Sequence, residues 1–302
     1  MPTKVAYRRA IAELLGGYSL TNNFLTTGDA TKLNLTVQGK STELTTTWLS
    51  YVWAFVPSLV ATIPQARIKK TGLTIATGIV DLEDTLGAVV ATGAEVELHS
   101  KLPAVAETHS GLSGSVTEAV DWAIRNLLIT DSSATITLAS GICDYSLAGH
   151  VAFLDRAERL LDVRVGDPNA LTTGSTAHRW TVYENASGLV LHFEEPFAFL
   201  SGPHLAYLVT RRPADSIIAV AGTWGASTAG LVNETDQARS SLNEVTTGAL
   251  AYCYRQLAAR SHGEERATYE ALYQVQMAEF ASLPNYINRS AMPAPEQQAE
   301  AA

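Results

Sequence analysis

The sequence predicts an α+β fold. Its N-terminal and central regions are β-rich and sandwich- or barrel-like, and it carries a short N-terminal helix, a middle helix and a C-terminal helix pair. Apolar residues alternate with polar ones through the β-rich regions, which is the period of strands. Two helical stripes each follow a Ser-x-x-Glu capping box. The uncharged stretch TWLSYVWAFVPSLVATI at 47–63 alternates large and small residues and contains Pro57, which favours a buried strand over a membrane helix.

The N-terminal helix is expected over 1–17, where Gly16 and Gly17 end it as a C-cap. A Thr-rich β region follows over 18–112, with ARIKK, LTIATGIV and AEVELHS as its later strands. Within it, large apolar side chains share one face of the uncharged strand and are predicted to be core residues first and interface residues second: Leu49, Tyr51, Trp53 and Phe55.

The middle helix is expected over 113–130, because Ser115 and Glu118 form a capping box ahead of an apolar stripe. A second β region over 131–213 contains the hairpin HRWTVYENASGLVLHFEEP and the strand HLAYLVTRRP. Residues 214–240 are expected to form a loop.

The chain closes with an αα-hairpin over 241–284, which begins at the capping box of Ser241 and Glu244 and is divided at Gly263. The tail over 285–302 is rich in Pro, Ala, Gln and Glu, which predicts disorder unless a partner orders it.

The net charge of −9 and the lack of a basic cluster argue against sequence-specific nucleic-acid binding. Of the two cysteines, Cys143 and Cys253, each is interpreted as a small buried hydrophobe rather than half of a disulfide or a metal ligand. The N-terminus lacks the apolar core of a secretory signal, so synthesis in a reducing cytoplasm is expected.

The candidates for chemistry are weak, so we expect no enzyme, cofactor or metal site. His99 and His109 flank Glu107 without a fourth ligand at metal-binding spacing. Glu194 and Glu195 are adjacent on a strand and point to opposite faces, so they do not flank one glycosidic bond. GASTAG at 225–230 lacks the lysine of a phosphate loop, and LVNETDQAR at 231–239 lacks the glycine and terminal glutamate of an EF-hand.

The order of elements resembles that of tailed-bacteriophage head-to-tail connector proteins (neck or portal adaptor proteins). The resemblance lies in RRAIAELLGG followed by TTGDATKLNL, the aromatic strand WLSYVWAFV, the basic strand ARIKK, the helix VTEAVDWAIRNLL and the closing helix pair. It implies a structural virion protein, assembled in the host bacterial cytoplasm, that forms a ring with copies of itself and contacts portal, neck or tail proteins. Genomic DNA would pass through without specific binding, and no membrane or small-molecule partner is implied. The alternatives are another tail or baseplate binding module, or a carbohydrate-active enzyme.

The second helix of the pair carries more aromatic surface than one short partner helix needs to cover. We therefore predict that part of its stripe, with the residues beyond Pro284, contacts a neighbouring subunit or a portal-like ring. The alternative is that the whole stripe packs on the first helix and the β domain. The candidate interface residues are Tyr269, Tyr273, Met277, Phe280 and Tyr286.

Overall fold

The fold is taken from a computed structural model of the chain. It describes residues 1–25, 29–35, 51–70, 78–106, 114–151, 154, 160–166, 176–177, 179–198, 204–220, 223–226 and 231–287. Leu49, Glu107, His109 and residues 227–230 and 288–302, all named above, lie outside these ranges.

The predicted α+β class is confirmed. The helices are α1 (Lys4–Leu15), α3 (Val116–Arg125), α5 (Leu242–Arg260) and α6 (Gly263–Ala281). The first strands are β1 (Tyr18–Asn22), β2 (Lys32–Asn34), β3 (Trp53–Phe55), β4 (Gln65–Arg67), β5 (Ile79–Asp81) and β6 (Glu95–His99). The central strands are β7 (Leu128–Leu138), β8 (Asp144–Ser146), β9 (Leu160–Gly166), β10 (Thr176–Ala177), β11 (Trp180–Asn185), β12 (Gly188–Phe193) and β13 (His204–Pro213). The last are β14 (Ile217–Val220), β15 (Thr223–Ala226) and β16 (Gln237–Ala238).

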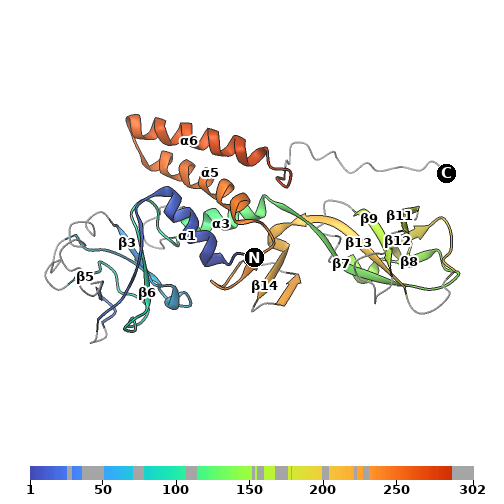
Figure 1. Cartoon of the computed structure of the whole chain (residues 1–302), viewed down its shortest axis with the longest axis horizontal. Coiled ribbons are helices and arrows are strands. Elements are labelled where there is room, and N and C mark those ends of the chain that lie inside the picture. The colour runs from blue at the N-terminus through green and yellow to red at the C-terminus, as the bar shows by residue number, and fades with distance from the viewer. Residues whose placement is uncertain are drawn as a thin grey trace.

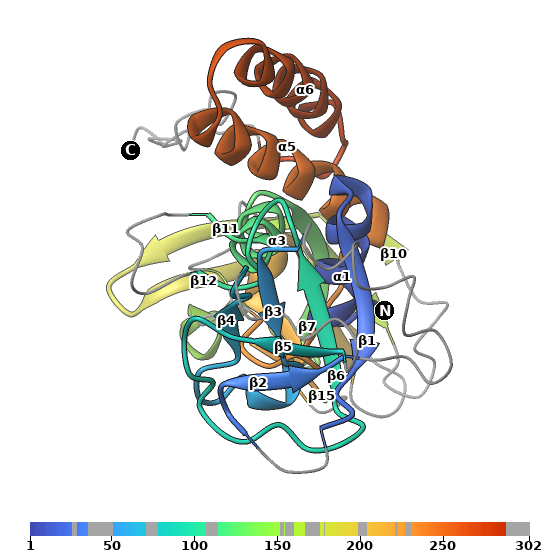
Figure 2. The ribbon, with the colours of Figure 1, turned by 90° about the vertical axis from the view of Figure 1, so that its left-hand side faces the viewer.

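These elements form an elongated molecule in which two β-rich units lie at opposite ends of a helical centre (Figure 1). The N-terminal β unit, made from β1 to β6, lies at one end, and the sandwich unit, made from β7 to β13, lies at the other. The antiparallel helices α5 and α6 project on one side of the centre, and the turned view shows α6 as the outermost helix (Figure 2).

The N-terminal β unit contains an antiparallel sheet in the order β1-β6-β3-β4 and a smaller pair, β2-β5. The uncharged stretch supplies β3, which pairs with β4 along one edge and β6 along the other. All three of its residues are buried, so both faces of the strand are covered as well. Tyr51, Trp53 and Phe55 are all at most 9% exposed, as predicted, and the alternating Ala54 is fully buried too.

The sandwich unit packs a sheet in the order β10-β9-β13-β7 against a second in the order β11-β12-β8. The predicted hairpin is β11 and β12, paired in register from Trp180 and Phe193 to Asn185 and Gly188. Apolar residues from both sheets form one core, including Val163, Leu191, Phe193 and Leu208. The sheets stay open at their edges in the described residues, so the sandwich form of the prediction holds and the barrel form does not.

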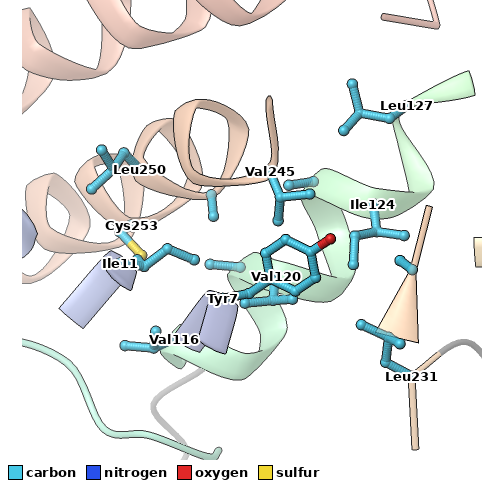
Figure 3. Packing of buried hydrophobic residues seen from close by; sticks show 14 of the residues in the cluster. Tyr7, Ile11, Val116, Val120, Ile124, Leu127, Leu231, Val245, Leu250 and Cys253 are labelled. Carbon is cyan, nitrogen blue, oxygen red and sulfur yellow. The ribbon is translucent and has the colours of Figure 1, made fainter. Parts of the chain in front are cut away.

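The helical centre packs α1 and α5 against α3. Figure 3 shows side chains of all three helices directed into one cluster, among them Tyr7, Ile11, Val120, Val245 and Cys253. The two predicted capping boxes, Ser115 with Glu118 and Ser241 with Glu244, are both formed.

Two boundary predictions were wrong. Residues 214–240, predicted as a loop, contain the strands β14, β15 and β16, and Gln237 also forms a bridge with Thr3. The start of the predicted tail is structured, because the carbonyl of Asn285 accepts a hydrogen bond from the backbone N–H of Leu128 and Tyr286 bridges to Leu127. The three strands pair with one another within the segment, whereas the start of the tail is ordered by residues far away in sequence, which local composition does not reveal.

Candidate functional site: the helix pair and the buried charge clusters

The helix pair turns sharply between α5 and α6. Only Ser261 and His262 separate the two helices, and Gly263 adopts a positive φ of 58° as α6 begins. This left-handed conformation favours glycine, so Gly263 fits the tight connection.

Phe280 anchors the C-terminal end of α6 in the helical centre. Its side chain is 0% exposed, and its ring centroid lies 5.6 Å from that of Trp122 and 5.0 Å from that of Tyr286. Gly248 of α5 lets the ring approach: a Cβ at this position would lie 2.5 Å from a ring carbon of Phe280. Phe280 is therefore a core residue, and its inclusion in the predicted interface is corrected.

The other candidate interface residues are half-buried. Tyr269 stacks on Tyr254 of α5 with ring centroids 6.3 Å apart, and its hydroxyl accepts a hydrogen bond from Lys101 at 3.3 Å. Met277 and Tyr286 pack against the helical core, and Tyr273 is also half-buried on α6. These four side chains keep part of their surface in solvent, and their contact with a neighbouring subunit stays a prediction.

The outward face of α6 carries two exposed large apolar side chains among charged and polar ones such as Thr268 and Glu279. Val275 is 63% exposed and Leu272 is 38% exposed. The exposed small residues Ala267, Ala271 and Ala278 flank them on the helix surface. The aromatic stripe that the sequence singled out thus faces mainly inward, and the exposed apolar surface of this helix is centred on Leu272 and Val275.

A buried charge cluster, which sequence reasoning missed, joins α1 to the N-terminal β unit. Arg8 is 0% exposed and binds Glu97 of β6 in bidentate fashion, with Nε–Oε2 and Nη2–Oε1 distances of 3.0 and 2.9 Å. Its remaining nitrogen, Nη1, donates to Glu234, and its guanidinium carbon lies 4.4 Å from the ring centroid of Phe55. Arg9 adds hydrogen bonds to Glu97 at 2.8 Å and to Glu95 at 2.7 Å.

The electrostatics of this cluster keep Glu97 ionised. Burial opposes its ionisation, but the neighbouring His99, Arg8 and Arg9 outweigh burial and lower the pKa of Glu97 to about 2. His99 is 2% exposed, with Nε2 3.5 Å from Oε2 of Glu97. Burial lowers the pKa of His99, so the imidazole is neutral near pH 7.

A second buried pair lies between the sandwich unit and the centre. Arg212 of β13 donates to Asp131 of β7 at 3.1 Å, and Arg239 lies 4.0 Å from the same carboxylate. The register between β7 and β13 shifts between Leu208 and Thr210, so a bulge lies beside this pair.

The segment between β15 and α5 receives contacts from several parts of the chain. The ammonium of Lys4 donates to the carbonyl of Leu231 at 2.7 Å. Asp236 accepts from the backbone N–H of Asn233 at 2.7 Å. Glu234 and Asp236, the carboxylates of the segment compared above with a calcium loop, therefore both bind other groups of the protein, since Glu234 binds Arg8.

The remaining residues considered for catalysis or metal binding do not come together into one site in the described part of the chain. No group of at least three His, Cys, Asp or Glu side chains arranged for a metal ion occurs among the described residues. Glu194 lies 3.6 Å from Arg179, and both are exposed. His192 and Asp144 pair at 2.7 Å on an exposed face of the sandwich unit.

A hollow of about 650 Å³ lies on the N-terminal β unit. Its lining includes Trp53, Ile63, Arg67, Glu83 and Asp84. It adjoins the β3–β4 hairpin and does not include any candidate residue from the helix pair.

Within the described ranges, no helix has the length and apolar character needed to cross a membrane. Comparison with known proteins gave no match to a family model, to a curated protein or to a solved structure.

Proposed function

We propose that this chain is a structural virion protein: a ring-forming head-to-tail connector that joins a portal to a neck or tail and lets DNA pass. The proposal starts from the resemblance in element order, which runs from RRAIAELLGG through the aromatic strand to the closing helix pair. The elongated arrangement supports it, because a subunit with separate β units at its ends presents different surfaces to the tiers above and below (Figure 1).

The observation that carries the proposal is the pair of exposed apolar side chains on the outward side of α6. One face of the helix packs on α5 and ends in the buried Phe280, while the opposite face presents Leu272 and Val275 to solvent. A helix that is fixed along one side and presents large apolar side chains on the other is suited to dock against a neighbouring subunit. The half-buried Tyr269, Tyr273 and Met277 border that surface and would extend it.

The test is a double substitution, Leu272→Ser with Val275→Ser, in a phage that encodes this chain. We expect largely monomeric protein at micromolar concentration in sedimentation, and ring formation when the portal is added. The substituted protein should keep its melting temperature and lose ring formation and virion assembly, because exposed side chains contribute little to folding. Val89→Ser is the matched control, since Val89 is 54% exposed in the N-terminal β unit. Normal assembly of the double variant would refute the role of this face, and glycan binding by a stable monomer would favour the binding-module alternative.

A further inference from the structure

The N-terminal β unit and the helical centre have separate apolar cores. Buried residues of β2 to β6 and their connecting segments form one cluster, and buried residues of α1, α3 and α5 form another. Where α1 meets β6, charges face each other instead: the buried Arg8 and Glu97, with the partly exposed Arg9 and the exposed Glu95 beside them.

The covalent connections at this junction are single chain segments. The chain leaves α1 through Gly16 and Gly17, which have positive φ angles of 75° and 70°, and enters β1 at Tyr18. It returns after β6 toward α3. The connections leave the angle between the two bodies to noncovalent contacts, because glycines permit more than one backbone conformation.

A buried ion cluster fixes an angle in a way that apolar packing does not. Bidentate guanidinium–carboxylate bonds are directional, so Arg8 and Glu97 hold one relative orientation of α1 and β6. Their desolvation offsets much of their attraction, so such a cluster adds little net stability for its size. Arg8 also remains bound to Glu234, which keeps it attached to the centre when the contact to β6 is lost.

We propose that the Arg8–Arg9–Glu95–Glu97 cluster is an orientation joint. It holds the N-terminal β unit at one angle on the helical centre, and loss of its contacts lets that unit rotate as a folded body. Polar interfaces between units of one chain commonly permit such relative motion. The proposal does not depend on the connector role, although a protein that docks between tiers of an assembly would use such a joint.

The experiment measures distances between spin labels on the two bodies in the full chain. Cysteines replace Val89 in the N-terminal β unit and Val275 on α6, which are 54% and 63% exposed. The background carries Cys143→Ser, and the native Cys253 is fully buried and stays unlabelled. A second label pair, Ile142→Cys with Val275→Cys, reports on the sandwich unit in the same way.

In the parent protein we expect one narrow distance distribution for each pair. Glu97→Gln should broaden or split the distribution from position 89 to 275 and leave the one from 142 to 275 unchanged. Glu194→Gln, which removes an exposed carboxylate from the sandwich unit, should change neither. Arg8→Lys serves if Glu97→Gln fails to fold, because it keeps the positive charge and removes the bidentate geometry. A folded Glu97→Gln or Arg8→Lys protein with the parent distribution would overturn the proposal, as would equal broadening of both pairs.

Discussion

The packing of Phe280 against Gly248 makes a quantitative prediction about the helix pair. Phe280→Ala removes a fully buried ring that contacts Trp122 and Tyr286. Substitutions of this kind cost about 3–5 kcal/mol, because the lost burial adds to the cost of the cavity that remains. With an unfolding entropy of about 2.1 cal/mol/K per residue over the whole chain, the melting temperature should fall by about 5–8 °C.

A double-mutant cycle makes the test specific to this contact. Gly248→Ala improves intrinsic helix propensity by about 1 kcal/mol, yet in the parent protein its Cβ would meet the Phe280 ring at 2.5 Å. We therefore expect Gly248→Ala to destabilise the parent and to stabilise the Phe280→Ala protein, where the ring is gone. Thermal unfolding followed by circular dichroism measures all four proteins, with Val275→Ser as the exposed control on the same helix. The reasoning fails if Gly248→Ala has the same sign in both backgrounds.

Other predictions concern acid, thiols and DNA. The folded state lowers the pKa of His99 below its ordinary 6.5, so the unfolded chain binds the proton more readily and the free energy of unfolding should fall as pH drops below about 6.5. In urea unfolding measured at a series of pH values, His99→Gln should remove this fall and leave the further loss of stability that Glu97 causes between about pH 4.5 and 2. An unchanged pH dependence in His99→Gln would contradict this. Burial raises the pKa of the Cys253 thiol, so in Cys143→Ser protein a colorimetric thiol reagent should react with Cys253 only once the protein is unfolded. Rapid reaction of Cys253 in the folded variant would contradict its buried placement. The net charge of −9 predicts negligible binding to duplex DNA at physiological salt in fluorescence anisotropy; micromolar affinity that weakens steeply with salt would show otherwise.

Local signals in the sequence predicted the elements that local interactions determine. The capping boxes at Ser115 and Ser241 start α3 and α5 as predicted, and the strand HLAYLVTRRP matches β13 from His204 to Pro213. These features depend on residues within a few positions of each other, so their pattern can be read directly.

Very short strands and long-range contacts were not predictable in this way. The strands β14 to β16 pair with one another within 214–240, but each has at most four residues, which is too short for a clear alternation, and the bridge from Gln237 to Thr3 spans most of the chain. One feature of the sequence could have indicated the charge cluster. Glu95, Glu97 and His99 alternate along β6, which places polar groups on one face of an otherwise apolar strand. The predicted interface on part of the α6 stripe includes Phe280, because composition alone does not reveal that Gly248 opens a place for its ring.

The contacts of α1 also bear on how the protein is made. Arg8 and Glu234 are 226 positions apart, and the backbone N–H of Lys4 donates to the carbonyl of Asp236. At a synthesis rate of about 5–20 residues per second, the ribosome needs about 11–45 s after making Arg8 before Glu234 exists. The N-terminal β unit and α3 are complete during that interval, while α1 waits for α5 and for the segment 231–240. A nascent chain stopped before residue 231 would therefore leave the side of α1 that α5 covers open to chaperones and proteases.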